Sequence, residues 1–347
     1  MYIGLDIGYS SVKVAYGSGP RADSTSSTPE VLRMPVGAAP KSKCGLSISG
    51  DAAIGMGHIV MVNGEEWVGA VLPQTLQNFV PVMDESYSRS QEYEALFKAA
   101  LSAVGAPVVE SVVTGLPVAH FLDPEIKGAL VERMVGVHEI RPGLTVEVKQ
   151  VKVVPQPAGA YGAQLLDIAN RQSRAAIDPS QTILVVDPGH FSLDWVINSQ
   201  GSFKLESSGS TPTAGEAIVR RAAELLSATH KLKVRPAKVQ DVVLSGAKPL
   251  AIGGREIDIW PAMKEAAAEV VRNNLKAIRG SIREVNNTSG VDLVLIAGGG
   301  ADLFEDGLGE AFPEAQVLAV RDSITANARG FWVFATQMKG QKAQASA

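Results

Sequence analysis

The sequence predicts an α/β protein made of two similar halves, and three observations along the chain support this fold class. Apolar runs typical of buried strands alternate with segments of helical periodicity, which favours mostly parallel central strands covered by helices. A buried strand, an Asp-x-Gly turn and a second strand occur together at residues 2–16 and again at residues 182–197. The length of 347 residues is also more than one hydrophobic core usually supports, so we expect two lobes.

The two hairpins align with each other when Asp6 is placed on Asp187. The alignment also matches three further pairs, namely Gly8 with Gly189, Ser11 with Ser192, and Lys13 with Asp194. Turns of this composition offer backbone N–H groups and hydroxyls to an anion, while the carboxylate can hold a hydrated Mg²⁺. Asp and Gly also form ordinary turns, so a single copy carries little weight. The repeat favours two facing hairpins that hold a polyphosphate.

Further elements of the first half follow the hairpin in order. Residues 18–40 are rich in Gly, Ser, Pro and Ala, which predicts a loop. Asn63-Gly64 separates two alternating runs and predicts a tight β-hairpin, so residues 35–75 should form a small β-containing insert. Apolar residues at helical spacing predict a helix over residues 91–104. The remaining predictions are strands at 108–118 and 144–154 and a helix from Pro155 to Ile168.

The second half repeats the alternation of strands and helices. Thr213 and Glu216 are spaced as a capping box, which predicts a helix that runs to about Lys231. One apolar stripe predicts a long helix over residues 261–285, inside an insert at about 232–288. The other predictions are turns at Ser245-Gly246 and Gly253-Gly254, a strand at 291–296, a helix at 324–337 and a disordered tail from Lys339. Lobe I is thus expected at residues 1–160 and 322–347, and lobe II at residues 161–321.

A third motif, LIAGGGADLF at residues 295–304, is a strand that ends in Gly298, Gly299 and Gly300. Glycines have no Cβ atom, so their backbone can approach a flat base or ribose closely, and the helix that follows offers N–H groups to a phosphate. Glycine runs also close ordinary strand-to-helix turns. Both interpretations are open for this motif taken alone.

Taken in order, these motifs resemble those of the actin, heat-shock-70 and sugar-kinase ATPase superfamily. LDIGYSSVKV and VVDPGHFSLD are similar to its two phosphate hairpins, and IAGGGADLF is similar to its adenosine motif. VVPQPAGAYG and ITANARGFW are similar to its two connecting helices. The resemblance implies an actin-like α/β fold, in which two lobes of duplicated ribonuclease-H-like domains surround a nucleotide cleft.

The resemblance also implies roles for individual residues. The implied catalytic residues are Asp6, Gln156 and Asp187, of which Asp6 and Asp187 would also contact Mg²⁺, Asp187 through water. The implied phosphate contacts are Gly8, Ser10, Ser11 and Lys13 in the first hairpin and Gly189, His190 and Ser192 in the second. The implied neighbours of adenosine are Glu216, Arg272, Gly298, Gly299 and Gly300. Glu216 and Arg272 lie on expected helices, where they are equally typical of solvated faces.

Three residues depart from the pattern of the superfamily. His190 and Phe191 stand where many members have Gly and Thr, so His190 either replaces a donor to the γ-phosphate or packs outside the site. Gln156 stands where ParM-like proteins often have Glu. Gln can orient a water molecule but cannot accept its proton, so Gln156 predicts slow hydrolysis. Alternatively, Gln156 only caps its helix.

Within the superfamily, the plasmid-segregation actins of the ParM/StbA and Alp group are the most similar, on the basis of VVTGLPVAHF, PQPAG, IAGGGADLF and ANARGFW. This resemblance implies an ATPase that uses ATP (or GTP) with Mg²⁺ and polymerises into filaments. The filaments would move plasmid DNA through a DNA-binding adaptor that recognises the centromere. The alternatives are a small-molecule kinase, which would need an acidic base that the first half does not show, a chaperone, and a membrane-tethered actin.

Composition narrows the partners and the compartment. The net charge of −4 provides no general basic surface for direct binding of nucleic acid. A single cysteine, Cys44, excludes an internal disulfide and fits a reducing compartment. There is no apolar run long enough to span a bilayer and no signal segment, so we expect a cytoplasmic protein with no membrane partner.

Overall fold

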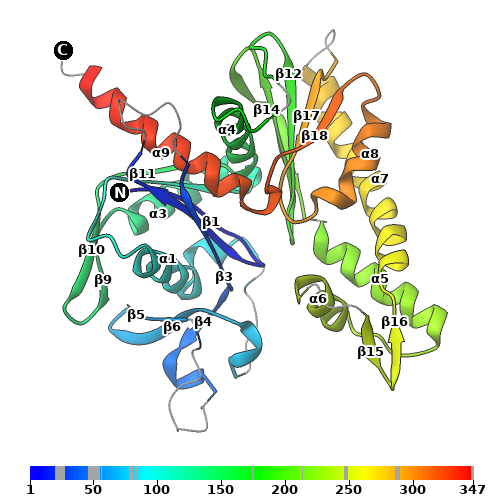
Figure 1. Cartoon of the computed structure of the whole chain (residues 1–347), viewed down its shortest axis with the longest axis horizontal. Coiled ribbons are helices and arrows are strands. Elements are labelled where there is room, and N and C mark those ends of the chain that lie inside the picture. Colours follow the sequence, from blue (N-terminus) through cyan, green and yellow to red (C-terminus); the bar gives the residue numbers. More distant parts are fainter. Residues whose placement is uncertain are drawn as a thin grey trace. The chain divides into compact units, whose positions relative to one another are not determined.

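The computed structural model describes residues 1–19, 28–45, 55, 57–77, 82, 84–173, 176–212, 214–245, 249–285 and 290–344 (Figure 1). The chain forms two compact units. Unit 1 comprises Met1–Asp178 and Val320–Ala347, and unit 2 comprises Pro179–Ala319. Each unit contains one five-stranded sheet with its own hydrophobic core.

The five-stranded sheet of unit 1 has the order β11-β8-β1-β2-β3. Its strands are β1 (Tyr2–Ile7), β2 (Val12–Gly17), β3 (Glu30–Met34), β8 (Ser111–Leu116) and β11 (Val151–Pro155). The sheet of unit 2 has the order β14-β13-β12-β17-β18. Its strands are β12 (Thr182–Pro188), β13 (Leu193–Ser199), β14 (Ser202–Thr211), β17 (Leu293–Ile296) and β18 (Gln316–Ala319).

The two sheets share one topology. In each, the first three strands form an antiparallel meander, and the first strand pairs in parallel with the fourth, which pairs in parallel with the fifth. Asp6 faces Lys13 in the register of β1 and β2, and Asp187 faces Asp194 at the same place in β12 and β13. The internal repeat predicted from the sequence is therefore confirmed.

Smaller elements surround the sheet of unit 1. Two three-stranded sheets have the orders β4-β6-β5 and β7-β10-β9. Their strands are β4 (Gly37–Pro40), β5 (His58–Val62), β6 (Glu65–Val71), β7 (Val108–Val109), β9 (Gly136–Arg141) and β10 (Leu144–Val148). The helices are η1 (Lys41–Lys43), η2 (Pro73–Thr75), η3 (Tyr87–Arg89), α1 (Gln91–Val104), α2 (Val118–Phe121) and α3 (Pro124–Met134). The predicted helix over 91–104 is confirmed, and so is the tight turn, in which Asn63 and Gly64 have φ values of 50° and 80°.

Three predictions for this half need correction. The loop expected over residues 18–40 contains β3 and β4. β3 has no clear strand pattern in the sequence, because it is an edge strand with largely exposed side chains. The strand expected over 108–118 is divided into β7 and β8, and Pro117 begins α2. The strand expected over 144–154 is also two strands, because β10 pairs with β7 and β9 whereas β11 pairs with β8 in another sheet.

Unit 2 adds helices to its sheet as the apolar periodicity predicts. Its elements are α5 (Gly215–His230), α6 (Pro236–Ser245), β15 (Leu250–Ile252), β16 (Arg255–Ile257), α7 (Trp260–Val285) and α8 (Ala301–Ala311). Gly253 and Gly254 make the turn between β15 and β16, as expected. Thr213 of the predicted capping box and Gly246 of the predicted turn lie outside the described residues.

Two connecting helices lie in unit 1, α4 (Gln156–Ala169) and α9 (Ala326–Gln344), with η4 (Ser323–Thr325) before the second. Figure 1 shows α9 against α4 and across β1. Glycine permits this approach, because a Cβ atom on Gly330 would overlap the carbonyl oxygen of Gly159, and one on Gly4 would overlap the backbone of α9. The disordered tail predicted from Lys339 is wrong as far as Gln344, and residues 345–347 lie outside the described residues.

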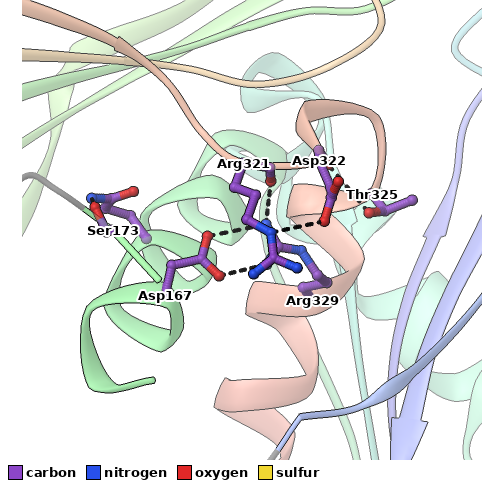
Figure 2. Close-up of polar contacts among 7 residues, drawn as sticks. Asp167, Ser173, Arg321, Asp322, Thr325 and Arg329 are labelled. Atoms are coloured by element: carbon purple, nitrogen blue, oxygen red, sulfur yellow. Dashed lines mark hydrogen bonds and ion pairs between the residues drawn. The ribbon is translucent and has the colours of Figure 1, made fainter. Parts of the chain in front are cut away.

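A buried ion pair fastens the two connecting helices (Figure 2). Arg329 Nη1 of α9 lies 2.7 Å from Asp167 Oδ1 of α4, and Arg329 Nη2 lies 3.3 Å from Asp167 Oδ2. Nη2 of Arg329 also donates to the carbonyl of Arg321. The Asp167 carbonyl accepts hydrogen bonds from the amides of Gln172 and Ser173 at 2.7 and 3.2 Å. The cluster therefore fixes the end of α4 and the start of α9.

The aromatic residues of α9 are part of the core of unit 1. Phe331 is fully buried and Trp332 is 2% exposed, in a cluster with residues of β1, β2 and β8. None of the helices in the described part of the chain combines the length and hydropathy that a membrane crossing requires.

Candidate functional site

The turn between β1 and β2 brings together five residues predicted to act in unit 1. The amide of Gly8 donates to the carbonyl of Ser11 over 3.2 Å, which closes the turn. The buried carboxylate of Asp6 has Lys13 Nζ at 3.2 Å and Gln156 Nε2 at 3.1 Å. An acid, a cation and an amide thus converge at the end of β1, where a parallel sheet commonly places its ligand.

Gln156 is oriented by Asp6. An ionised carboxylate only accepts hydrogen bonds, so the amide nitrogen of Gln156 faces Asp6 and its carbonyl oxygen points elsewhere. Gln156 is the first residue of α4, yet its side chain bonds Asp6. The side chain also packs over Gly115, where a Cβ atom would come within 2.8 Å of Gln156 Cγ. This geometry favours a role for Gln156 at the turn over a role as a helix cap.

The hydroxyl of Ser11 is a candidate donor to a ligand of this turn. Its side-chain oxygen is buried and has no hydrogen-bond partner within the described part of the chain. A buried hydroxyl without a partner is costly, and a bound anion is one way to satisfy it. Ser10 stands next to it in the same turn and is half-buried.

The turn between β12 and β13 has the same backbone geometry in unit 2. The amide of Gly189 donates to the carbonyl of Ser192 over 2.9 Å, as Gly8 does to Ser11. Asp187 is buried, with 6% of its surface exposed. The side chains differ, because Asp194 replaces the lysine of the first hairpin and accepts hydrogen bonds from the hydroxyls of Ser192 (2.6 Å) and Ser210. Asp194 therefore stabilises the turn of unit 2.

His190 is attached to two helices of unit 2. Its carbonyl accepts from the amide of Glu216 at 2.7 Å, and its Nε2 atom lies 3.3 Å from Gln240 Nε2 of α6. Burial lowers the pKa of the His190 imidazole from its ordinary value of 6.5, and the nearby Glu216 opposes this shift. The imidazole is therefore neutral at pH 7, so it can offer a hydrogen bond but adds no charge.

The glycine motif lies directly against the second hairpin. Gly298 has a φ of 85°, and a Cβ atom there would overlap Oδ1 of Asp187. The amide of Gly300 donates to the carbonyl of Pro188 over 3.0 Å. Gly299 is exposed and has open space around the position of a Cβ atom. The structure thus brings the second of the predicted phosphate hairpins and the predicted adenosine motif together within unit 2.

Glu216 and Arg272, the other two predicted neighbours of adenosine, lie on the helices α5 and α7. The Glu216 carboxylate pairs with Arg220 at 2.5 Å on the exposed side of α5. Arg272 is exposed on α7, and within the described part of the chain no polar contact joins it to the glycine motif. Their predicted place beside adenosine remains a prediction.

A metal at these turns would depend on few protein ligands. Among the described residues, no group of three or more His, Cys, Asp or Glu side chains is placed to hold a metal ion. Mg²⁺ commonly binds one or two carboxylates and completes its shell with water and substrate phosphates. Each turn has one such acid, Asp6 in unit 1 and Asp187 in unit 2, and each of these buried carboxylates fits that chemistry by itself.

An aromatic contact at the first turn was not predicted from the sequence. Tyr9, inside the turn, stacks on Tyr87 of η3 with ring centroids 4.7 Å apart and planes at 25°. Tyr87 O–H donates to the carbonyl of Gly8 over 3.4 Å. No spacing rule links residues so far apart, and the only hint was a tyrosine within the polar turn.

Comparisons with known proteins agree with this geometry. Residues 4–159 match the family described as "Actin like proteins N terminal domain". No curated protein sequence matches the chain significantly. Among solved structures, the archaeal actin homologue Ta0583 is 19% identical with a TM-score of 0.72, over 97% of this chain and 99% of that one.

Two further structures have similar folds. A ParM filament protein from Clostridium botulinum is 19% identical with a TM-score of 0.67, over 96% of this chain and 98% of that one. The actin-like protein Alp7A is 12% identical with a TM-score of 0.69, over 99% of this chain and 98% of that one.

The duplicated sheet and the N-terminal match show that the fold is actin-like, as the sequence predicts. Within that class, the chain resembles the ParM and Alp proteins and the archaeal actin homologue, with which it shares its fold over nearly its whole length.

Proposed function

We propose that the chain is a Mg²⁺-dependent ATPase that polymerises into nucleotide-dependent filaments. The observation that carries this proposal is the occurrence of one acidic turn at the same place in two sheets of the same topology. In both turns a glycine amide donates to the carbonyl three residues later, and a buried aspartate is the next-to-last residue of the preceding strand. The recurrence of the same aspartate, glycine and hydrogen bond in both turns supports a shared role in binding phosphate.

The residues of unit 1 would act on phosphate through charge and hydrogen bonds. Lys13, held beside Asp6, would neutralise phosphate charge, and the hydroxyl of Ser11 would donate to a phosphate oxygen. Gln156, anchored to Asp6 by its nitrogen, would use its carbonyl oxygen to orient the attacking water. Because glutamine accepts no proton, the rate rests on orientation and charge, and turnover should be slow.

The residues of unit 2 would supply the metal contact and the surface for the nucleoside. Asp187 would bind hydrated Mg²⁺, and Gly298 would keep the carboxylate close to the glycine motif. Bound Mg²⁺ would offset the negative charge on the phosphates during transfer. Gly299, which has open space at the position of a Cβ atom, would leave room for the nucleoside, while His190 would offer a neutral hydrogen-bonding group.

Similar structures support both parts of the proposal. One structure of the archaeal homologue is a complex with ADP, which supports nucleotide binding. A fifteen-stranded ParM filament and an Alp12 filament support assembly. By its likeness to ParM, we propose that the filament segregates plasmid DNA in the cytoplasm through a DNA-binding adaptor. The net charge of −4 supports an adaptor rather than direct contact with DNA.

Light scattering tests the proposal when phosphate release is followed in the same sample. With Mg²⁺ and ATP, scattering should rise above a critical protein concentration and decay as phosphate appears, whereas ADP should give no lasting rise. GTP in place of ATP tests the choice of base. Phosphate release without assembly would contradict the filament and favour a non-filamentous enzyme such as a small-molecule kinase. Neither release nor assembly would contradict the ATPase itself.

A further inference from the structure

The short helix η3, which comes just before α1, contacts the predicted phosphate turn through the ring of Tyr87. Tyr9 and Tyr87 stack face to face, and Tyr87 meets the buried ring of Tyr93 edge-on, with centroids 5.3 Å apart. Such offset and edge-on pairs have the geometry that aromatic rings prefer. The three rings form a tyrosine ladder, defined by Tyr9, Tyr87 and Tyr93, that links the turn to the first turn of α1.

Local hydrogen bonds fix the middle of this ladder. The carboxylate of Asp84 accepts from both the amide and the hydroxyl of Ser86, at 2.8 and 2.5 Å. The amide of Tyr87 donates to the carbonyl of Asp84 at 3.1 Å. At the other end, Ser90 caps α1 by accepting from the amide of Tyr93 at 3.1 Å. Hydrogen bonds on both sides of Tyr87 therefore fix the backbone that carries its ring.

The hydroxyl of Tyr87 reaches the backbone of the turn. It donates to the carbonyl of Gly8 over 3.4 Å, a long hydrogen bond. Burial raises the pKa of the Tyr87 phenol above its ordinary value of 10, so the phenol keeps the proton that it donates. The carbonyl of Gly8 is consequently directed toward Tyr87.

The direction of that carbonyl decides the direction of the next amide. In a trans peptide the C=O and N–H groups point to opposite sides. With the Gly8 carbonyl directed at Tyr87, the N–H of Tyr9 points to the opposite side of the turn. Amides fixed in this way form the donors with which a turn binds an anion.

We propose that Tyr87 is a positioning residue of the phosphate turn, which it holds through the Gly8–Tyr9 peptide in the orientation that binds the nucleotide phosphates. The inference rests on the proposed function, because it assigns to Tyr87 the preorganisation of a turn that binds ATP. Preorganisation raises affinity by removing the cost of ordering the turn on binding.

The test compares Tyr87→Phe with the wild-type protein and with the matched control Tyr16→Phe. Tyr87→Phe keeps the stacked ring and removes only the hydroxyl at Gly8. Tyr16→Phe also removes a tyrosine hydroxyl from unit 1. Tyr16 lies on β2, outside the turn, and its hydroxyl donates to the carboxylate of Glu30 on β3 at 2.7 Å. Two readouts are used, amide hydrogen exchange of the nucleotide-free protein and calorimetric binding of Mg²⁺-ATP.

Tyr87→Phe should speed amide exchange of residues 9–11 several-fold while the exchange of α1 stays as in the wild type. It should also weaken binding of Mg²⁺-ATP by about 5- to 10-fold, the loss of one modest hydrogen bond. Tyr16→Phe should leave both quantities unchanged. Unchanged exchange and affinity in Tyr87→Phe would overturn the inference, and so would an equal effect of Tyr16→Phe.

A failure of the proposed function would look different. The wild-type protein would then bind no nucleotide, whereas the exchange experiment would still show whether Tyr87 orders the turn. Faster exchange in Tyr87→Phe without nucleotide binding by the wild type would refute the phosphate role and leave only the backbone contact.

Discussion

Arg329 holds Asp167 in a two-point ion pair that is almost completely withdrawn from water. The side chains are 8% and 1% exposed, and the two pairs of atoms lie 2.7 and 3.3 Å apart (Figure 2). Residues 162 positions apart in the sequence thus join the two connecting helices of unit 1.

Breaking this pair from one side should be costly, because the remaining charge stays buried without its partner. We expect Arg329→Met or Asp167→Leu to lower the free energy of unfolding by about 3–5 kcal/mol each. The double variant should lose clearly less than the sum of the two. Urea unfolding of all four proteins measures this coupling. Single losses below about 1 kcal/mol, as at an exposed pair, would contradict the assignment.

The crossing of α4 and α9 predicts a steric effect at Gly330. A Cβ atom there overlaps the carbonyl oxygen of Gly159, so Gly330→Ala should force the helices apart and cost about 3 kcal/mol or more. Gly128 in α3 is the matched control, because a Cβ atom there meets open space. Gly128→Ala should stabilise the protein by about 0.5–1 kcal/mol. Thermal unfolding of both variants checks the difference, and equal effects would contradict it.

Gln156 predicts a separation of binding from turnover. Gln156→Ala should bind ATP almost as the wild type does but release phosphate about 10- to 100-fold more slowly, because it no longer orients water. Single-turnover phosphate release and equilibrium binding measure the two quantities. Gln164→Ala removes another amide of α4, one that bonds Ser173 at 2.7 Å, and should keep the wild-type turnover. An equal loss of binding and turnover in Gln156→Ala would indicate a structural role.

The buried imidazole of His190 predicts a dependence of stability on pH. The folded state lowers the pKa of His190 below 6.5, so around and below that pH the unfolded chain binds more protons. Stability should therefore fall as the pH is lowered through about 6.5. His58 and His138, whose pKa values burial also lowers, should contribute in the same direction.

Urea unfolding between pH 5.5 and 8 measures this dependence. His190→Asn should reduce the slope without removing it, because the other two histidines remain. A slope that is unchanged in His190→Asn would show that the imidazole titrates alike in the folded and unfolded chain.

The sequence predicts the parts of the fold that carry strong local signals. The two acidic hairpins, the Asn63-Gly64 turn and the long helix α7 are examples, because turn residues and periodicity are properties of short segments. Edge strand β3 gives no such signal, since charged and exposed side chains interrupt its pattern. The alternation over residues 144–154 continues across a change of sheet, because alternation does not record which strand is the partner.

In the candidate site, too, features with a local sequence signal could be predicted and contacts between distant residues could not. The acids, glycines and serines of both turns could be named from their repeat. The bond from Gln156 to Asp6 spans 150 positions, and the contact of Tyr87 with Gly8 spans 79, so neither has a local signature. The two turns also differ in a way that the sequence does not show. In unit 2 the hydroxyl of Ser192 donates to Asp194, whereas the hydroxyl of Ser11 in unit 1 has no partner among the described residues.

The most direct test of the ATPase proposal is Mg²⁺-dependent phosphate release by Asp187→Ala. Asp187 is the next-to-last residue of β12 and lies against Gly298. We expect its loss to abolish hydrolysis while the unfolding transition stays close to that of the wild type. Asp292→Asn is the matched control. Asp292 directly precedes β17, the parallel partner of β12, and its carboxylate accepts a hydrogen bond from the amide of Thr182 at the opposite end of β12 from Asp187. This variant should hydrolyse ATP normally. Wild-type turnover in Asp187→Ala would contradict the proposal that this turn binds the metal and phosphate.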